Sequence, residues 1–464
     1  MHEFMYYVFD SILIPLIRTN FHVTESNTHR YRLFFFRQDV WRSLSEPAIA
    51  SLKLNMFEEI KLERAQTILC SRTLGFSQVR LLPKETGVRP IMNLRRRTLK
   101  KGYQGMLGSS INSVLAPIFN VLTAEQVTNS LWRCQHLLIN QSSNPSRLGS
   151  ALFSVGDLHA KLKSFKSVIQ NSPKPLYFAK VDVKAAFDTI PQNAVVRLIS
   201  SIPSESEYRI AKHVEIKPGE GYHEGDDRSK PIRKWTAFAK ASDDFQSFEE
   251  HLESELATRR KNTIFVENIV NQFREKDELL NLLAEHIQCN MVKIGKKFYR
   301  QKEGIPQGSV LSSLLCNYFY GNLEMEHLQF LSHEDSLLLR LIDDFLLITI
   351  NPAHAKQFLQ VMHDGLPEYG VRVNPDKTLA NFEATINGKK VPRLVGSRNF
   401  PYCGSFIDTK TLNISKDRER RKNTGGFASN FIEIQLICLA ILDSLTVEYS
   451  KMPGKAFHRK VLSK

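Results

Sequence analysis

The chain has 464 residues, of which 42% are hydrophobic and 24% charged, an ordinary globular composition that excludes a disordered chain. Lysine and arginine number 63 against 48 aspartates and glutamates, and the net charge of +15 is compatible with a nucleic-acid partner without requiring one. The six cysteines are scattered, with no C-x-x-C pair and no suitably spaced histidines, which predicts a reduced intracellular protein without a zinc site.

The first part of the chain predicts a helix followed by a ribbon of two strands. Apolar residues at helical spacing in residues 1–20 predict a helix that needs a partner to cover it. The run is interrupted by Asp10 and Pro15 and is too short for a membrane span, so we expect neither a signal peptide nor a membrane span. Residues 21–25 and 31–37 then interleave aromatic residues with arginine. Such a ribbon can stack on bases or pack its rings into the core.

A second pair of strands is predicted at residues 79–83 and 88–92, around a turn that contains glycine. Lys84 and Arg89 flank its tip, where two cations on a rigid ribbon either grip a triphosphate or remain solvated. Residues 110–170 predict helices. Between the second strand of this pair and these helices lies a basic run that is either a phosphate track or a solvated face, namely Arg95, Arg96, Arg97, Lys100 and Lys101.

The middle of the chain predicts one strand and then an insertion. Residues 176–183 predict a strand that carries Asp182 at its end, where the carboxylate can project into a cleft or have a structural role. The composition turns polar from about 200 to 290, with helical patterns near 248–256 and 279–287. We therefore expect a helical insertion between two parts of one domain.

A glycine loop precedes an apolar helix in the next segment. Residues 292–294 and 298–300 predict a hairpin around Gly295, and the loop Gly304–Ser309 follows it. Glycines let a ligand approach the backbone closely, and we expect Ser309 to be the N-cap of the helix that follows.

Residues 337–350, written LLLRLIDDFLLITI, place two aspartates inside an apolar run. Buried carboxylates are costly unless they are paired or bound to a cation, and adjacent strand residues point to opposite faces. We therefore predict strands at 338–341 and 345–350 with Asp343 and Asp344 at the bend. There the two acids either share a cation or are solvated.

The remaining elements are predicted from local patterns alone. We expect a helix at 355–366, a strand at 371–373, a turn at 374–377 and a hairpin that begins at 400–404.

Asp182, Asp343 and Asp344 form a candidate metal site although Asp182 lies far from the other two in the sequence. Oxygen ligands without histidine or cysteine suit Mg²⁺. Two such ions about 4 Å apart can activate a 3′-hydroxyl and stabilise a leaving pyrophosphate. The combination predicts the palm of a polymerase.

The ordered motifs of the chain resemble those of telomerase reverse transcriptases. FAKVDVKAAFDTIPQ, EGIPQGSVLSSLLCNYFYGNLE, LLLRLIDDFLLIT, VNPDKT and FPYCGSFIDTKTL are similar to motifs A, B′, C, D and E of that family. RLLPKETGVRPIMN resembles motifs 1 and 2, and FHVTE with the aromatic ribbon resembles the T motif. Retroviral and intron-type reverse transcriptases share motifs A to E. The T motif and the long insertion between A and B′ favour the telomerase type.

The resemblance implies an α+β right-hand polymerase fold. It comprises fingers and palm of the reverse-transcriptase type, with an antiparallel palm sheet packed on helices, a helical insertion and a truncated thumb. The implied domains are 1–45, the end of an RNA-binding domain; 46–191, fingers and the first part of the palm; 192–290, the insertion in the fingers; 291–412, the rest of the palm; and 413–464, the start of the thumb. The family pattern also contains an N-terminal domain, a complete RNA-binding domain and a complete thumb, and it lacks the apolar block at 424–442. A mis-predicted exon boundary is our hypothesis for that block.

The same resemblance implies roles for individual residues. The catalytic and metal-binding residues are Asp182, Asp343 and Asp344. The residues implied to bind the nucleotide are Lys84, Arg89, Phe187, Gln307, Gly308 and Lys377. Phe187 would lie under the sugar and exclude a 2′-hydroxyl, and Lys377 is a candidate proton donor to pyrophosphate. The implied primer grip consists of Tyr402, Cys403 and Gly404.

The implied activity is that of an RNA-directed DNA polymerase that uses two Mg²⁺ ions and dNTPs. It would copy a telomerase RNA template to add telomeric repeats to a single-stranded DNA primer at chromosome ends in the nucleus. Other telomerase holoenzyme proteins are implied as partners, and no membrane. Two alternatives remain: a catalytically silent relative that only binds nucleic acid, and a reverse transcriptase of the retroelement or intron type.

Overall fold

The computed structural model describes most of the chain up to residue 417. The described ranges are 2–25, 33–84, 87–97, 108–136, 147–169, 174–219, 231–242, 247–256 and 262–417. The predicted start of the thumb lies almost entirely outside the described residues. The apolar block at 424–442 and the basic residues Lys100 and Lys101 also lie outside them.

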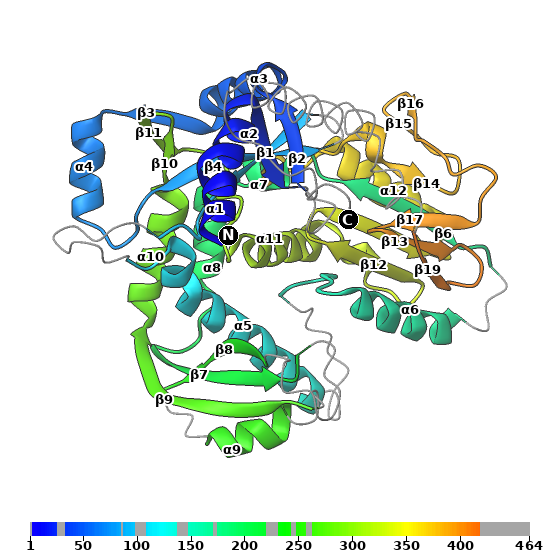
Figure 1. Ribbon diagram of the computed structural model, residues 1–464. Helices are drawn as coiled ribbons and strands as arrows, with labels where there is room; N and C mark the ends of the chain where they lie inside the picture. The colour runs from blue at the N-terminus through cyan, green and yellow to red at the C-terminus, as the bar shows by residue number, and fades with distance from the viewer. Residues whose placement is uncertain are drawn as a thin grey trace.

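A four-stranded antiparallel sheet forms the centre of one half of the molecule (Figure 1). Its strand order is β12-β13-β6-β14, with β6 at Tyr177–Asp182, β12 at Ser336–Leu341, β13 at Asp344–Thr349 and β14 at Leu379–Ala380. We call it the palm sheet. The predicted strands at 176–183, 338–341 and 345–350 are confirmed, and the last two form the predicted hairpin.

Both faces of the palm sheet are buried. On one face, Phe345 and Leu347 pack against α11 (Ser312–His327) and α12 (Pro352–Asp364). On the other, Leu346 and Ile348 pack against two further elements. These are α6 (Val155–Ile169) and the sheet of β17 (Asn399–Tyr402), β18 (Ser405–Asp408) and β19 (Ile414–Lys416). Alternate residues of a strand point to opposite faces, so a strand covered on both sides reads as a continuous apolar run.

A second, five-stranded sheet contains the hairpins predicted at 79–92 and 292–300. Its order is β3-β11-β10-β4-β5, with β3 at Phe57–Ile60, β4 at Ser77–Lys84, β5 at Gly87–Met92, β10 at Met291–Ile294 and β11 at Lys297–Gln301. Next to it lie α3 (Gln38–Met56) and α4 (Leu62–Cys70). The β10–β11 hairpin, which follows the insertion, therefore pairs with the hairpin that precedes it by about 200 residues.

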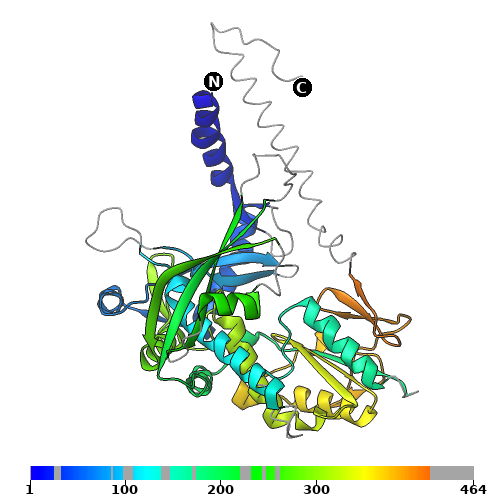
Figure 2. The same cartoon turned by 90° about the horizontal axis from the view of Figure 1, so that it is seen from below.

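The N-terminal segment is helical, as predicted. It consists of α1 (His2–Tyr7), a π-helical stretch η1 (Val8–Leu13) and α2 (Ile14–Asn20), and it projects from the body of the molecule (Figure 2). Strands β1 (Phe21–Glu25) and β2 (Leu33–Arg37) form the predicted ribbon. Part of its aromatic surface packs inward, because Phe36 is buried against Trp41 and His22 stacks on Trp41 with ring centroids 4.0 Å apart. Among the helices of the described ranges, none is long and apolar enough to cross a membrane.

The prediction of a helical insertion is wrong, because a three-stranded antiparallel sheet forms its centre. The order is β8-β7-β9, with β7 at Glu207–Lys217, β8 at Ile232–Ala241 and β9 at Ile264–Glu275. The helices of the insertion are α8 (Gln192–Ser200), α9 (Phe248–His251) with η2 (Leu252–Leu256), and α10 (Lys276–Gln288). The last two match the predicted helical patterns. In EYRIAKHVEIK, charged and apolar residues alternate over residues 207–210 and again over 214–217, on either side of a shift in register, a strand pattern that the overall polarity obscured.

Two smaller predictions are also wrong. Residues 371–373 form only isolated bridges, from Val371 to Leu366 and from Val373 to Val183, and no strand. Helix α11 begins at Ser312, so Ser309 is not its N-cap, and the Ser309 hydroxyl instead accepts from the Leu311 amide at 3.2 Å. The helix starts late because the preceding loop is held against β5.

The other predicted elements are confirmed. They are α5 (Ile111–His136) and α6 within 110–170, α12 for 355–366, the turn η5 (Pro375–Lys377) and the β17–β18 hairpin. The remaining short elements are α7 (Ala186–Thr189), η3 (Gln329–Leu331), η4 (Pro367–Tyr369), β15 (Thr385–Ile386) and β16 (Lys389–Lys390).

Burial of the palm sheet leads to a first prediction. We expect Leu347→Ala to lower the free energy of unfolding by about 2 to 5 kcal/mol, because this side chain is 0% exposed and its loss leaves a cavity. The matched control is Leu54→Ala, where the side chain is 76% exposed and the loss should stay within about 0.5 kcal/mol. Urea unfolding measures both. Equal losses for the two variants would contradict the assignment of Leu347 to the core.

Candidate active site

The turn of the β12–β13 hairpin carries Asp343. Leu341 pairs with Asp344, so the turn consists of Ile342 and Asp343 alone. Two-residue turns between antiparallel strands usually require positive φ, and Ile342 has a φ of 59°. A β-branched residue in this region is strained and persists only when its surroundings hold it.

Asp344 lies directly opposite Asp182 on the neighbouring strand. The two residues are partners in the antiparallel β13–β6 register, where Cβ atoms lie about 5 Å apart. The amide of Val183 donates to the carbonyl of Asp343 at 3.2 Å, which fixes the turn against the end of β6. Sheet pairing thus brings Asp182 next to the hairpin that carries Asp343 and Asp344, although the two segments lie far apart in the sequence.

Two lysines approach these acids. The Lys377 ammonium contacts Oδ2 of Asp182 at 3.0 Å, and the Lys180 ammonium lies 3.9 Å from Oδ1 of Asp344. Burial and, to a smaller extent, the neighbouring Asp344 together raise the pKa of Asp343 to about 6, while Arg89 opposes the shift. Burial also raises the pKa of Asp344, against the opposing effect of Lys180. The site therefore holds more negative charge than its lysines compensate.

The carboxylate oxygens of these acids are ligands of the kind that a hard cation prefers. Asp182 and Asp344 supply carboxylate oxygens from facing strands, and crowding that raises the pKa of an acid is relieved by a bound cation. Within the described ranges, however, no three His, Cys, Asp or Glu side chains are arranged closely enough to hold a metal ion. In this conformation Asp182 and Asp344 form the pair, and Asp343 does not complete a cluster.

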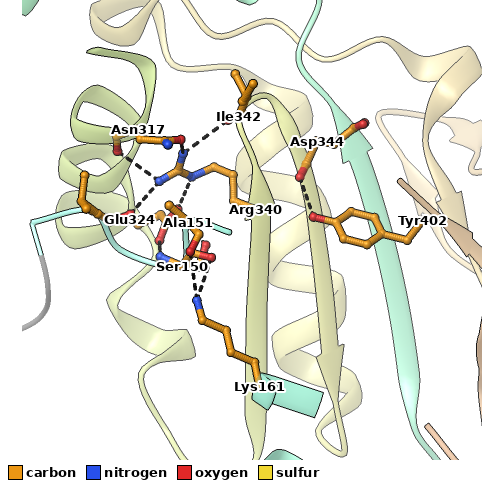
Figure 3. A network of polar contacts seen from close by, with 10 residues as sticks. Ser150, Ala151, Lys161, Asn317, Glu324, Arg340, Ile342, Asp344 and Tyr402 are labelled. Carbon is orange, nitrogen blue, oxygen red and sulfur yellow. Dashed lines mark hydrogen bonds and ion pairs between the residues drawn. The ribbon is translucent and has the colours of Figure 1, made fainter. Parts of the chain in front are cut away.

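The β17–β18 hairpin reaches the same site from the opposite sheet. Its turn is Cys403–Gly404, with φ of 47° and 74°, as a two-residue turn of type I′ requires. The Tyr402 hydroxyl donates to the Asp344 carbonyl at 3.0 Å (Figure 3), and the Cys403 thiol lies 3.8 Å from Oδ2 of Asp344. Burial raises the pKa of Cys403 to about 12, so the thiol remains neutral beside the carboxylate.

The Gln307–Gly308 loop lies against the end of β5. The Met92 amide donates to the Gln307 carbonyl at 2.8 Å, and the Asn112 side chain donates to the Gly308 carbonyl at 3.1 Å. Gly308 has a φ of 103°, and a Cβ there would lie 2.5 Å from the Met92 carbonyl oxygen. Glycine is therefore required at this position both by its conformation and by the close approach.

Phe187 and the cations of the β4–β5 hairpin lie around Asp188. Phe187 is partly buried against the core, and its carbonyl accepts from the Ile305 amide at 2.7 Å. The Asp188 carboxylate accepts from the Gln307 side chain at 2.7 Å. Burial raises the pKa of Asp188, whereas Gln307, Arg89 and Lys84 lower it. Asp188 is thus a half-buried acid that the glycine loop contacts through Gln307 and on which the hairpin cations act electrostatically.

Sequence reasoning gave no role to Asp188, Lys180 or Asn112. Asp188 follows Phe187 directly, and the signal that could have identified it is an acid within an otherwise apolar turn. Lys180 alternates with Asp182 along β6, so strand periodicity places both on the same face. Asn112 has no such signal, because its contact with Gly308 joins segments that are distant in the chain.

Comparison with known families and sequences gives a consistent picture. Residues 1–52 match the family described as the RNA-binding domain of the telomerase ribonucleoprotein complex, and residues 258–405 match the reverse transcriptase (RNA-dependent DNA polymerase) family. Telomerase reverse transcriptase of Canis lupus familiaris is 31% identical over 97% of this chain and 38% of its own length. That of Takifugu rubripes is 30% identical over 89% of this chain and 37% of its own length. The chain thus spans less than two fifths of these relatives.

Solved structures show the same fold. Telomerase from Candida albicans, in complex with the TWJ fragment of telomeric RNA, has a TM-score of 0.59 at 19% identity, covering 89% of this chain and 56% of that one. Apo telomerase from Candida tropicalis truncated from its C-terminal domain has a TM-score of 0.57 at 22% identity, covering 89% and 66%. The predicted α+β fold of a right-hand polymerase is confirmed, apart from the helical character of the insertion.

The close approach at Gly308 leads to a second prediction. We expect Gly308→Ala to cost about 1 to 3 kcal/mol more unfolding free energy than Gly388→Ala. Both glycines have positive φ, but a Cβ at Gly388 would have nothing within 4 Å, so the difference isolates the contact with β5. Chemical denaturation of both variants measures it. Equal destabilisation would show that the loop does not pack against β5 in solution.

Proposed function

Because this chain belongs to the telomerase reverse transcriptase family, we propose that it carries the catalytic centre of an RNA-directed DNA polymerase. The observation that carries the proposal is the facing pair Asp182–Asp344, with Asp343 in the adjoining strained turn. Two crowded acids at the end of a sheet buried on both faces are costly to the fold, and a function in binding cations accounts for that cost.

Asp182, Asp343 and Asp344 would hold two Mg²⁺ ions, which when bound would neutralise charge on the attacking 3′-hydroxyl and the leaving pyrophosphate. Asp343 would join the pair by a change in its side-chain conformation. The protein's own contribution is mainly to position the reactants, because phosphoryl transfer needs little covalent work from side chains. Lys377, 3.0 Å from Asp182, is suited to donate a proton to the pyrophosphate.

We assign the nucleotide site to residues around the β4–β5 hairpin and the glycine loop. Lys84 and Arg89 would hold the triphosphate, and their electrostatic effect on Asp188 supports a location near the acids. Gln307 and Gly308 would contact the nucleotide and template. Phe187 would lie under the sugar and reject a 2′-hydroxyl.

Tyr402, Cys403 and Gly404 would position the primer end next to Asp344. The hydrogen bond from Tyr402 to the Asp344 backbone supports this role, because it couples the primer hairpin to the acid. We further propose that the fingers and palm comprise residues 46–191 and 291–412, interrupted by the insertion at 192–290.

The biological substrates follow from the family and are part of the proposal. They are an RNA template, a single-stranded telomeric DNA primer and dNTPs, acted on at chromosome ends in the nucleus, with other telomerase proteins as partners. The match of residues 1–52 to a telomerase RNA-binding domain supports an RNA partner.

Primer extension tests the catalytic role. With template RNA, DNA primer, dNTPs and Mg²⁺, we expect the wild-type chain to extend the primer and Asp343→Asn to reduce extension to background, because the amide cannot supply a carboxylate to the cation. Asp364→Asn is the matched control and should retain activity, since Asp364 is an exposed residue at the end of α12 whose carboxylate accepts from Gln360 and Asn387. Extension by Asp343→Asn at the wild-type rate would exclude the assignment. Template binding without extension by the wild type would instead favour a silent relative.

Sugar selection gives a separate prediction. We expect Phe187→Ala to raise incorporation of ribonucleotides relative to deoxynucleotides by roughly 10- to 100-fold, because removal of the ring makes room for a 2′-hydroxyl. Phe187→Tyr is the matched control, since it keeps the ring and should keep the selectivity. Competition between dNTP and rNTP in single-nucleotide extension measures the ratio. An unchanged ratio in Phe187→Ala would place the sugar elsewhere.

A further inference from the structure

Arg340 is a fully buried charged residue in strand β12, two residues before the strained turn. Its side chain is 0% exposed, so water cannot bind the guanidinium. Every N–H of the guanidinium instead has an acceptor within the protein (Figure 3). Nε donates to Glu324 at 2.5 Å. Nη1 donates to the Asn317 side chain at 3.0 Å and to the Ile342 carbonyl at 3.3 Å. Nη2 donates to the carbonyls of Leu148 and Asn317 at 2.8 and 3.1 Å.

The partner carboxylate, Glu324 of α11, is fixed equally well. It accepts from the Ser150 amide at 2.6 Å and from the Ser150 hydroxyl at 2.9 Å. Gly149 has a φ of 56°, and a Cβ at this position would collide with the Glu324 carboxylate. The segment around Ser150 thus closes over the ion pair and excludes water. A buried charge pair without remaining unsatisfied groups is geometrically specific, and removal of either member leaves an unpaired buried charge.

The backbone of the same segment extends the palm sheet. The Leu152 amide donates to the Arg340 carbonyl at 2.7 Å, and the Arg340 amide donates to the Ser150 carbonyl at 3.2 Å. Lys161 of α6 also donates to the carbonyls of Ser150 and Ala151. Arg340 therefore connects three separate parts of the chain, namely β12, α11 and residues 148–152.

One of these hydrogen bonds reaches the turn itself. The Ile342 carbonyl, which Nη1 of Arg340 contacts, belongs to the peptide that joins Ile342 to Asp343. The orientation of this peptide sets the direction in which the Asp343 side chain leaves the backbone. Because the φ of 59° at Ile342 is strained for a β-branched residue, the turn would relax if this contact were lost.

We propose that Arg340 is a positioning residue, which acts through the Ile342–Asp343 peptide to hold the turn from which the Asp343 side chain can join Asp182 and Asp344 around a cation; this role rests on the proposed polymerase function. Arginine is required because lysine has three rotatable donors instead of a planar fork of five, and lysine cannot serve all five acceptors. The role does not require contact with substrate, since all five donors are used within the protein.

The test compares Arg340→Lys with wild type and with the matched control Arg393→Lys, whose exposed guanidinium pairs with Glu383 at 2.8 Å. We expect Arg340→Lys to lower kcat about 10- to 100-fold, the range typical when a partner that orients metal ligands is changed. The KM for dNTP and the Kd for the RNA–DNA hybrid should stay within about twofold, because neither is contacted. Binding of Mn²⁺, followed by electron paramagnetic resonance without substrate, should weaken about tenfold. Arg393→Lys should match wild type.

A rescue experiment separates positioning from a general loss of stability. We expect Arg340→Lys/Ile342→Gly to recover at least about fivefold of the lost kcat, because glycine adopts positive φ without strain and needs less support. Glu324→Gln is a second variant in case Arg340→Lys does not fold, and it should shift kcat and Mn²⁺ affinity in the same direction. Wild-type kcat and Mn²⁺ affinity in folded Arg340→Lys or Glu324→Gln would overturn the proposal, as would a double variant that recovers nothing. A wild-type chain that binds the hybrid without extending it would overturn the polymerase function itself.

Discussion

The structure depends on the pairing of β6 with β13, which places Asp182 opposite Asp344. Nothing in the local sequence brings these two like charges together; the apolar residues beside them do. Val181 and Phe345 pair one step along the same strands and are completely buried. A shift of register by one residue would exchange Phe345 and Leu347 with Leu346 and Ile348 between the two buried faces, which are covered by different elements. The fit of these side chains to their own cover therefore fixes the acids in place.

Backbone contacts at glycines then bring the other functional segments to the same place. A Cβ on Gly304 would lie 2.5 Å from the Phe187 carbonyl oxygen, one on Gly308 would meet the Met92 carbonyl, and one on Gly370 would collide with the Thr189 carbonyl. All three have positive φ. Two of the three contacts involve α7, the short helix that carries Phe187. Its position is therefore set by main-chain contacts as well as by side-chain packing.

Much of this arrangement could be predicted from the sequence, because the relevant signals are local. Two aspartates in an apolar run predict a hairpin with acids at the bend, and Asp182 at the end of a β-branched run predicts a strand terminus. The sheet of the insertion was missed, since an alternating strand such as 207–217 is easily hidden by high overall polarity. Asp188 was missed because its role depends on a hydrogen bond with Gln307, which is 119 residues away in the sequence.

The need of Arg340 for buried partners could also be predicted from the sequence. An arginine within LLLRLI of a strand buried on both faces must have a partner, for the same reason that the two aspartates require a cation. The sequence therefore indicates that partners exist, while only the fold identifies Glu324 and Asn317.

The strained turn of the palm lies beside a buried, fully hydrogen-bonded arginine, and a physical reason connects the two. Burial and crowding raise the pKa of Asp343 from 3.8 to about 6, so its contribution to stability is lost as the pH rises through that interval. At neutral pH the ionised acid costs the fold on the order of 3 kcal/mol. The left-handed Ile342 adds to that cost. A turn that carries both the ionised acid and the strained backbone needs firm support from its surroundings. Arg340 supplies that support, because all of its guanidinium N–H groups are hydrogen-bonded and one of them holds the Ile342 carbonyl.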